Sequence, residues 1–287
     1  MPTDYVERRV ATDGGGLYVR DYPGRGPALV MMHGFPDHLG IYDELVPRLT
    51  EAGRRAVTFD FLGFGRSDKP DGAAYTFAGQ LGALDAVASA LELGPFVPVA
   101  HDSSGPAAIN FALAHPDRVA ELVILNAGYD DATPVHWPDM ITLFATRGLA
   151  ELSGAIAQSP EQFGWLLGWQ REKFSAAQPA DQRERFNAGV ARLIADNFME
   201  QPGSGRAFTQ LASRFHEELA RNATRLPELR RLGMRVKVIW GELDPYLNAD
   251  LARHYAAQFE HASLRLLRAG HWLQADVPEL VAREMLA

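Results

Sequence analysis

Short apolar runs alternate with helix-like stretches in both the first and the last parts of this chain, and no other feature restricts its fold as much. This alternation is typical of a mostly parallel sheet with helices on both faces, so we expect an α/β fold. The apolar runs predict strands at Gly16–Tyr22, Ala28–Met32, Arg55–Phe59, Phe96–Ala100, Glu121–Leu125, Val236–Trp240 and Ser263–Leu267. The stretches between them predict helices at Ile41–Ala52, Thr76–Leu93, Pro106–Ala114, Ala249–Phe259 and Pro278–Leu286. Asn248 is a candidate N-cap for the fourth helix, and Pro278 suits the first turn of the fifth.

The alternation stops between Tyr129 and Leu229, where the sequence has helix-like segments and no convincing strand. The segments lie near Trp137–Arg147, Pro160–Lys173, Ala180–Asp196 and Gly205–Arg221. We predict a helical lid over residues 129–229, inserted into an α/β core formed by residues 1–128 and 230–287. Such a block would cover the carboxyl ends of the strands, where α/β folds bind ligands. The alternative is a separate helical domain with its own core.

Composition narrows the functional classes. The chain has 287 residues, a formal net charge of −8 and no cysteine. The acidic balance argues against a nucleic-acid partner, and the missing cysteines exclude a disulfide framework, a thiolate metal site and a cysteine nucleophile. The sequence shows no signal peptide and no apolar run long enough to cross a bilayer. We therefore expect a cytoplasmic enzyme with a small-molecule substrate and no membrane partner, and a homodimer is compatible with this expectation.

A sharp turn joins the strand Phe96–Ala100 to the following helix. In a strand–turn–helix nucleophile elbow, the residues two before and two after the nucleophile must be small. The frame centred on Asp102 places Ala100 and Ser104 at those positions. Frames centred on Ser103 or Ser104 place larger residues there. Asp102 is therefore the candidate nucleophile, and the alternative is that its side chain only caps the helix.

Two further residues complete a triad with Asp102. Asp244 follows the late strand Val236–Trp240, at the edge of the sheet where active sites form. His271 follows the last predicted strand, and Glu242 is a weaker candidate for the acid. The order nucleophile, acid, histidine is that of the triads built on nucleophile elbows.

The segment His33-Gly34-Phe35-Pro36 ends another strand of the predicted sheet. We expect the backbone N–H groups of Phe35 and Ser103 to form an oxyanion hole. His33 and His101 are interpreted as structural residues rather than bases.

Together these motifs resemble the α/β-hydrolase superfamily, and within it the branch with an aspartate nucleophile, which contains epoxide hydrolases and haloalkane dehalogenases. The resemblance rests on His33–Pro36, Asp60–Pro70, His101-Asp102, Gly241–Asp244 and Gly270-His271. The stretch Asp60–Pro70 with His101-Asp102 is also similar to the mesoderm-specific-transcript group of hydrolases. The resemblance implies an α/β-hydrolase fold with a helical lid after the sixth strand, and a triad of Asp102, His271 and Asp244 without a cofactor or metal.

The sequence departs from this branch at the leaving-group positions. Haloalkane dehalogenases carry Trp after the nucleophile and Asn after the His-Gly, where this chain has Ser103 and Phe35. We therefore expect weak or no dehalogenation of simple haloalkanes. Fluoroacetate dehalogenases place arginines just after the nucleophile to hold the substrate carboxylate. This chain has Ser103 and Pro106 in that segment, so the sequence does not favour a fluoroacetate dehalogenase.

Epoxide hydrolases protonate the epoxide oxygen with lid tyrosines, but this chain has no Tyr from Asp130 to Leu229. The remaining candidates for this acid are four: Tyr129, Tyr246, His136 and His216.

An aspartate nucleophile also restricts the substrate. Its carboxylate is ionised at neutral pH and needs no base to attack. Attack on a saturated carbon gives an ester, whereas attack on an ester carbonyl gives an uphill anhydride. We therefore predict an epoxide hydrolase-like enzyme that acts on a small to medium apolar substrate through a covalent ester. The alternatives are a dehalogenase, a lyase, isomerase or cyclase that uses Asp102 and His271 as acid and base, and a non-catalytic binding protein.

Aromatic residues are expected to form an apolar pocket above Asp102. The predicted lining, besides Phe35, consists of Trp137, Tyr129, His136, Trp165, Trp169, Trp272 and Leu273. The alternative is that the lid tryptophans form the core of the lid itself.

Overall fold

A computed structural model describes residues 4–131, 135–199 and 204–287 of the chain, and these residues form a sheet of eight strands. The spatial order is β1-β2-β4-β3-β5-β6-β7-β8. The strands are β1 (Val6–Thr12), β2 (Gly15–Tyr22), β3 (Arg25–Met32), β4 (Arg54–Phe59), β5 (Val97–Asp102), β6 (Glu121–Ala127), β7 (Arg235–Gly241) and β8 (Ala262–Leu267). Strand β2 is antiparallel to both of its neighbours, β1 and β4, and all other neighbouring strands are parallel to each other. The predicted mostly parallel sheet is therefore confirmed.

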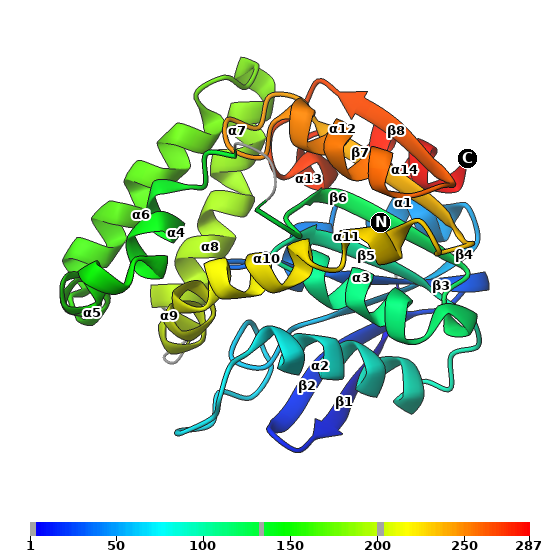
Figure 1. The fold of residues 1–287 in the computed structure, drawn as a ribbon, viewed down its shortest axis with the longest axis horizontal. Helices are drawn as coiled ribbons and strands as arrows, with labels where there is room; N and C mark the ends of the chain where they lie inside the picture. Colours follow the sequence, from blue (N-terminus) through cyan, green and yellow to red (C-terminus); the bar gives the residue numbers. More distant parts are fainter. Residues whose placement is uncertain (1–3, 132–134, 200–203) are drawn as a thin grey trace.

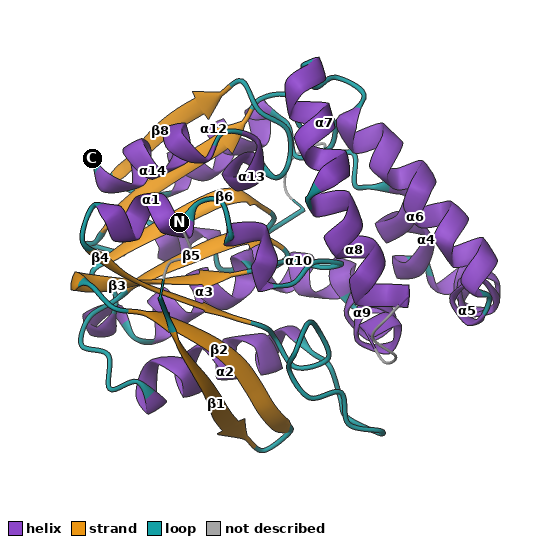
Figure 2. Cartoon of the chain, turned by 180° about the vertical axis from the view of Figure 1, so that it is seen from behind, coloured by secondary structure: helices purple, strands orange, loops and turns teal. Residues whose placement is uncertain are grey.

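Helices cover both faces of this sheet (Figures 1 and 2). They are α1 (Val46–Glu51), α2 (Phe77–Ala90), α3 (Gly105–Ala114), α12 (Ala249–Gln258), α13 (Leu273–Asp276) and α14 (Pro278–Leu286). Asn248 caps α12 as predicted, because its side chain accepts from the N–H groups of Asp250 and Leu251. Helix α1 is shorter than the predicted helix Ile41–Ala52. Pro47 stands in its first turn and lacks the N–H that would join it to the preceding turn.

Strand β1 was not predicted from the sequence. It lies at the edge of the sheet and pairs only with β2, and Val10 is its one buried residue. Its exposed residues include Glu7, Arg8 and Arg9. Charged residues are common on edge strands because they discourage further strand pairing, and they also remove the apolar signal that identifies a strand in the sequence.

The residues described between β6 and β7 form helices and no strand. They are α4 (Asp139–Ala145), α5 (Ala150–Gln158), α6 (Pro160–Ser175), α7 (Ala180–Ala188), α8 (Val190–Met199), α9 (Ser204–Ser213), α10 (Phe215–Ala223) and α11 (Leu226–Leu229). We call α4–α11 the helical insertion. Two predicted long helices each consist of two shorter ones, α7–α8 and α9–α10.

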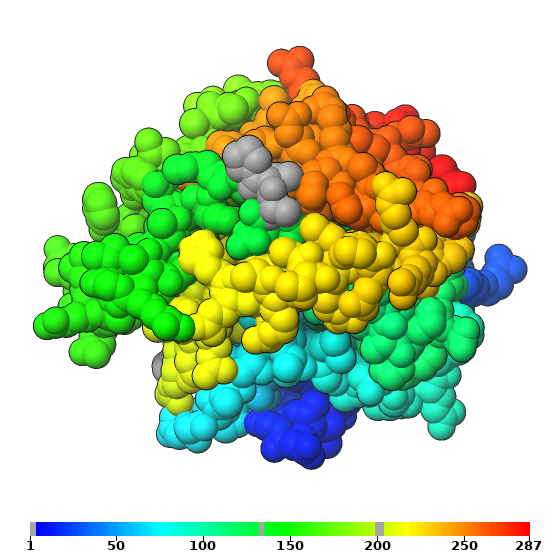
Figure 3. All heavy atoms as spheres, in the orientation of Figure 1, coloured from blue at the N-terminus to red at the C-terminus, as the bar shows by residue number. Residues whose placement is uncertain are grey.

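Helices α4–α9 stand beside the sheet in Figure 1, and α10 runs back towards the core. In the space-filling view the green and yellow residues of the insertion form a continuous surface with the core (Figure 3).

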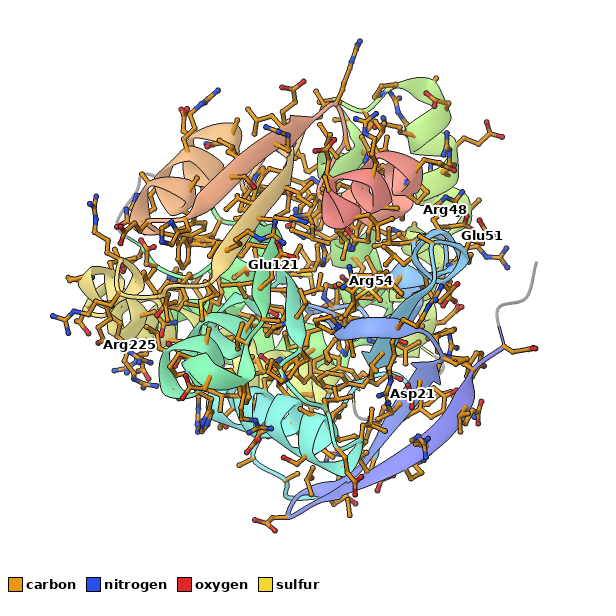
Figure 4. All side chains as sticks on the ribbon, turned by 90° about the vertical axis from the view of Figure 1, so that its right-hand side faces the viewer. Asp21, Arg48, Glu51, Arg54, Glu121 and Arg225 are labelled. Atoms are coloured by element: carbon orange, nitrogen blue, oxygen red, sulfur yellow. The ribbon has the colours of Figure 1, made fainter. Side chains whose placement is uncertain are left out.

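The opposite end of the sheet carries charged side chains. There Glu121 begins β6 (Figure 4) and forms an ion pair with Lys237, whose Nζ lies 3.4 Å from its Oε1. Within the ranges described, no helix is long and apolar enough to cross a membrane.

Helix α3 begins against the end of β6 at a glycine. A Cβ on Gly105 would lie 2.1 Å from the carbonyl oxygen of Gly128, which is closer than any real Cβ contact. A larger residue would therefore push α3 away from the sheet and move the turn that precedes it. By contrast, a Cβ on Gly82, inside α2, would meet no atom within 4 Å.

We predict opposite effects of alanine at these two glycines. Gly105→Ala should destabilise the protein by about 1–3 kcal/mol, because the methyl group overpacks against backbone. Gly82→Ala should stabilise it by up to about 1 kcal/mol, because alanine has the higher helix propensity. Thermal unfolding monitored by circular dichroism measures both. A Gly105→Ala protein that melts at or above the wild-type temperature would contradict the proposed packing.

Candidate active site

Asp102 lies at the sharp turn between β5 and α3. Its φ of 53° is in the left-handed region, which is unfavourable for a residue other than glycine. The turn is held by Ser104, whose Oγ accepts from the N–H of His101 at 2.9 Å and donates to its carbonyl oxygen at 2.7 Å. A small residue is needed at this position because its side chain folds back into the turn. The local conformation is thus that of a nucleophile elbow centred on Asp102.

The fold brings Asp102, His271 and Asp244 together. Nε2 of His271 lies 3.2 Å from Oδ2 of Asp102, and Nδ1 of His271 lies 2.6 Å from Oδ2 of Asp244. The side chain of Asp102 is 21% exposed, whereas those of His271 and Asp244 are 2% and 0% exposed. Asp102 is therefore the member of the three that a ligand can reach.

Asn126, at the end of β6, positions Asp244 and was missed by the sequence analysis. Its Nδ2 donates to Oδ2 of Asp244 at 2.9 Å, and its Oδ1 accepts from the N–H of Gly241 at 2.7 Å. The other oxygen of Asp244 accepts from the N–H groups of Tyr246 and Leu247 at 3.0 and 3.1 Å. A polar residue near the end of an otherwise apolar strand, next to the strand that carries the acid, is the signal that could have identified Asn126.

The charges of the three groups depend on one another. Burial disfavours a charged imidazole, but Asp244 and then Asp102 outweigh burial and raise the pKa of His271 to about 10. Burial also opposes the ionisation of Asp102, but its hydrogen bond to His271 and the imidazolium charge hold the pKa of Asp102 below its ordinary value. At neutral pH the free site therefore contains an imidazolium between two carboxylates.

His101, which precedes Asp102 in the turn, supports the loop that carries His271. Burial lowers the pKa of His101 to about 3, so its ring is neutral. Its Nε2 lies 3.0 Å from the carbonyl oxygen of His271 and can donate to it. Asp37 lies beneath this loop, where its carboxylate accepts from the indole N–H of Trp272 at 2.8 Å. Burial, with the charge of Asp102, raises the pKa of Asp37 to about 7.

The segment His33–Pro36 passes directly over Asp102. A Cβ on Gly34 would lie 2.5 Å from Oδ1 of Asp102, so only glycine permits this approach. In the free site the N–H of Ser103 donates to the same oxygen. The structure thus places both predicted oxyanion-hole segments beside the carboxylate. His33 braces this segment, because its Nε2 accepts from the N–H of Phe61 at 3.0 Å and burial lowers its pKa to about 3.

Two small cavities adjoin the carboxylate of Asp102. The α6 cavity, of about 40 Å³, is lined by residues that include Leu167, Gln170, Arg171 and Trp272. The Trp137 cavity, of about 20 Å³, is lined by residues that include Ser103, Trp137 and Phe215. They share six residues: Phe35, Asp102, Pro138, Ile141, Phe174 and His271. Cavities of this size hold only a few waters, which points to a small ligand.

Of the residues predicted to line the pocket, Phe35, Trp137 and Trp272 border these two cavities, and the other residues do not. Trp165 is 68% exposed, and Trp169 lies beneath the ammonium group of Lys173 on the outer side of α6. The reason is the phase of this helix, which turns Leu167, Gln170, Arg171 and Phe174 towards the cavity.

Three further residues lie outside the lining. The side chain of His136 is 78% exposed, so it faces solvent rather than the cavity. Tyr129 is buried and donates to Asn110, and Leu273 is buried in the core.

None of the four candidate acids is part of the described lining of either cavity. His136 and His216 are exposed. The hydroxyl of Tyr246 is engaged with Asp139 and Gln170, and burial raises its pKa to about 12. By contrast, Oγ of Ser103 is buried beside Asp102 without a hydrogen-bond partner among the described residues.

Among the residues that the structure describes, no group of three or more His, Cys, Asp or Glu residues could hold a metal ion.

Comparisons with known proteins give consistent results. The model of the α/β hydrolase fold family matches residues 27–278. An epoxide hydrolase of Caballeronia sordidicola is 38% identical over 113 residues, which are 39% of this chain and 34% of that protein. A haloalkane dehalogenase of Mycobacterium marinum is 28% identical over 275 residues, which are 93% of this chain and 86% of that protein.

Solved structures show the same fold. The epoxide hydrolase CorEH superposes with a TM-score of 0.78 at 19% identity, over 99% of this chain and 98% of that one. An esterase from Exiguobacterium antarcticum superposes with a TM-score of 0.73 at 21% identity, over 98% of both chains. At these identities the likeness concerns the fold alone.

The raised pKa of His271 predicts a pH-dependent stability. A group whose folded pKa of about 10 exceeds its ordinary value of 6.5 stabilises the protein fully below pH 6.5, and this contribution is lost as the pH rises through 10. The free energy of unfolding of the wild type should therefore exceed that of His271→Gln most at pH 6, and the difference should shrink towards pH 10. Urea unfolding of both proteins across this range measures it. A difference that does not change with pH would show that His271 is not charged in the folded protein.

Proposed function

Because this chain belongs to the α/β hydrolase fold family, we propose that it is a hydrolase that uses Asp102 as a nucleophile and forms a covalent ester with its substrate. The observation that carries the proposal is the accessible carboxylate of Asp102 on a strained turn, with His271 3.2 Å away. The chain is related to epoxide hydrolases and to haloalkane dehalogenases, and both act on a carbon that bears a leaving group. The helical insertion acts as a lid in this proposal, because Phe174 of α6 covers His271 with ring centroids 5.0 Å apart.

In the first half-reaction, an oxygen of Asp102 attacks a saturated carbon of the substrate. A carbon–oxygen bond forms to Asp102, and the bond to the leaving oxygen or halide breaks with its electron pair. The new ester is uncharged, so His271 loses one of the two anions that raise its pKa. The imidazolium proton then passes to the opened alkoxide, or to solvent when the leaving group is a halide.

In the second half-reaction, neutral His271 removes a proton from water, which attacks the acyl carbon of Asp102. Asp244 holds the imidazole in the tautomer that presents Nε2 as the base. The backbone N–H groups of Phe35 and Ser103 stabilise the oxyanion of the tetrahedral intermediate, and the loss of one such donor typically costs about 3 kcal/mol of barrier. The alcohol leaves with the proton from His271, and the regenerated carboxyl group of Asp102 returns a proton to the imidazole.

Epoxide opening is the first candidate reaction, and its support is the epoxide hydrolase relative. Halide displacement is the second candidate, because a halide needs no proton and the four candidate acids lie outside the described lining of the cavities. The hydroxyl of Ser103, which has no hydrogen-bond partner among the described residues, is a donor for either leaving group in the Trp137 cavity. A parallel assay of short epoxides and short halides decides between the two reactions.

We predict that His271→Gln stops the reaction after the first half. Attack needs only the ionised carboxylate of Asp102, and in the variant an opened alkoxide takes its proton from water, whereas hydrolysis of the ester needs His271 as a base. The variant should therefore accumulate a protein species heavier by the mass of the substrate. Intact-protein mass spectrometry with an accepted substrate detects this species, and peptide mapping locates it at Asp102.

Two control variants separate the alternatives. Asp102→Ala should form no adduct, and Asp244→Asn should form the adduct and hydrolyse it slowly, because the imidazole tautomer is disturbed. An adduct on Ser103 or Ser104 would show that another residue of the turn is the nucleophile. Turnover that survives Asp102→Asn without any adduct would support acid–base catalysis, as in a lyase or isomerase.

A further inference from the structure

An arginine of the helical insertion lines the same cavity as the triad. Arg171 of α6 borders the α6 cavity together with Asp102 and His271. Leu167, Gln170, Arg171 and Phe174 all line this cavity, and their spacing of three and four residues puts them on one face of the helix. The helix therefore holds Arg171 on the side that faces the nucleophile.

Arg171 forms no ion pair with the residues that the structure describes. One guanidinium nitrogen donates to the carbonyl oxygen of Ala191 in α8 at 3.0 Å. A guanidinium has five N–H donors arranged as a fork, so most of them remain available to a ligand.

The surroundings of Arg171 make an anionic ligand favourable. Most other residues of the α6 cavity are apolar, among them Met140, Ile141, Ile194 and Phe208. A charged group beside apolar side chains loses hydration, and a paired anion restores the lost interactions. The triad alone would oppose such a ligand, because its two carboxylates and one imidazolium carry a net negative charge.

We propose that Arg171 binds a carboxylate of the substrate whose saturated carbon is attacked by Asp102, a step that rests on the proposed function. The substrate is then a short compound with an electrophilic carbon near one end and a carboxylate at the other, rather than the wholly apolar compound expected from the sequence. The guanidinium fork suits both carboxylates and phosphates, and the cavity of about 40 Å³ favours the smaller group. Arg171 holds this group on the α6 side and so directs the reactive carbon towards Asp102.

Binding of unreactive ligands tests this proposal without any chemistry at Asp102. Butyrate and butyramide have nearly the same shape, and only butyrate carries a charge. Isothermal titration calorimetry should show that the wild type binds butyrate more tightly than butyramide. Arg171→Gln, which retains a donor for Ala191 but has no charge, should weaken butyrate binding about tenfold or more and leave butyramide binding unchanged. Arg171→Lys should restore part of the preference for butyrate.

A matched control uses another arginine of the helical insertion. Arg183 also donates to a backbone carbonyl, that of Gln178 at 3.2 Å, but it lines a separate surface hollow. Arg183→Gln should therefore bind both ligands as the wild type does, and thermal unfolding verifies that each variant is folded.

Three results would overturn the proposal. Equal weakening of butyrate and butyramide by Arg171→Gln would show that Arg171 only braces α6 against α8. Butyrate affinity that is unchanged in Arg171→Gln would show that it does not bind the carboxylate. A wild-type protein that binds butyrate no more tightly than butyramide would also show that Arg171 does not bind the carboxylate. Neither ligand is attacked, so these results are independent of whether an ester can be trapped on Asp102.

Discussion

The contact of His271 with two carboxylates is the interaction on which the rest of the site depends. Asp244 is fully buried, and an unpaired carboxylate in that position would be strongly destabilising. It is stabilised by His271 at 2.6 Å, by Asn126 and by two backbone N–H groups. These donors come from the ends of β6, β7 and β8. The parallel order of the strands therefore determines the position of the imidazole and, through it, the hydrogen bond to Asp102.

The features that could be predicted from the sequence are those set by the sheet. The seven predicted strands are all present. Strands β3 to β7 are parallel strands inside the sheet and are apolar on both faces, which gives them a continuous apolar signal, whereas β1 lies exposed at an edge and carries no such signal. The approach of Asp102, Asp244 and His271 follows from the same topology, since the carboxyl ends of parallel strands meet at one edge of a sheet. Side-chain types and chain order were therefore enough to identify these three residues as a group.

The residues of the helical insertion could not be placed in this way. Both tryptophans of α6 were expected in the cavity, but Trp165 is exposed and Arg171 and Phe174 take the inner face. An amphipathic pattern defines a helix, but the face that meets the site depends on packing against other helices. Asn126 was missed for a related reason. Its polar side chain near the end of an apolar strand is a local signal, but its role becomes clear only when the strand that carries Asp244 is known to lie beside it.

The same contact that orients His271 also prevents it from acting as a base in the free protein. With Asp102 ionised, the imidazole holds a proton at neutral pH and has no capacity to accept another. Formation of an ester on Asp102 removes one of the two negative charges beside His271, and the remaining carboxylate of Asp244 alone cannot hold the pKa of His271 as high. In the proposed reaction the base is therefore produced by the step that precedes its use. Water activation is then restricted to molecules that already carry the ester.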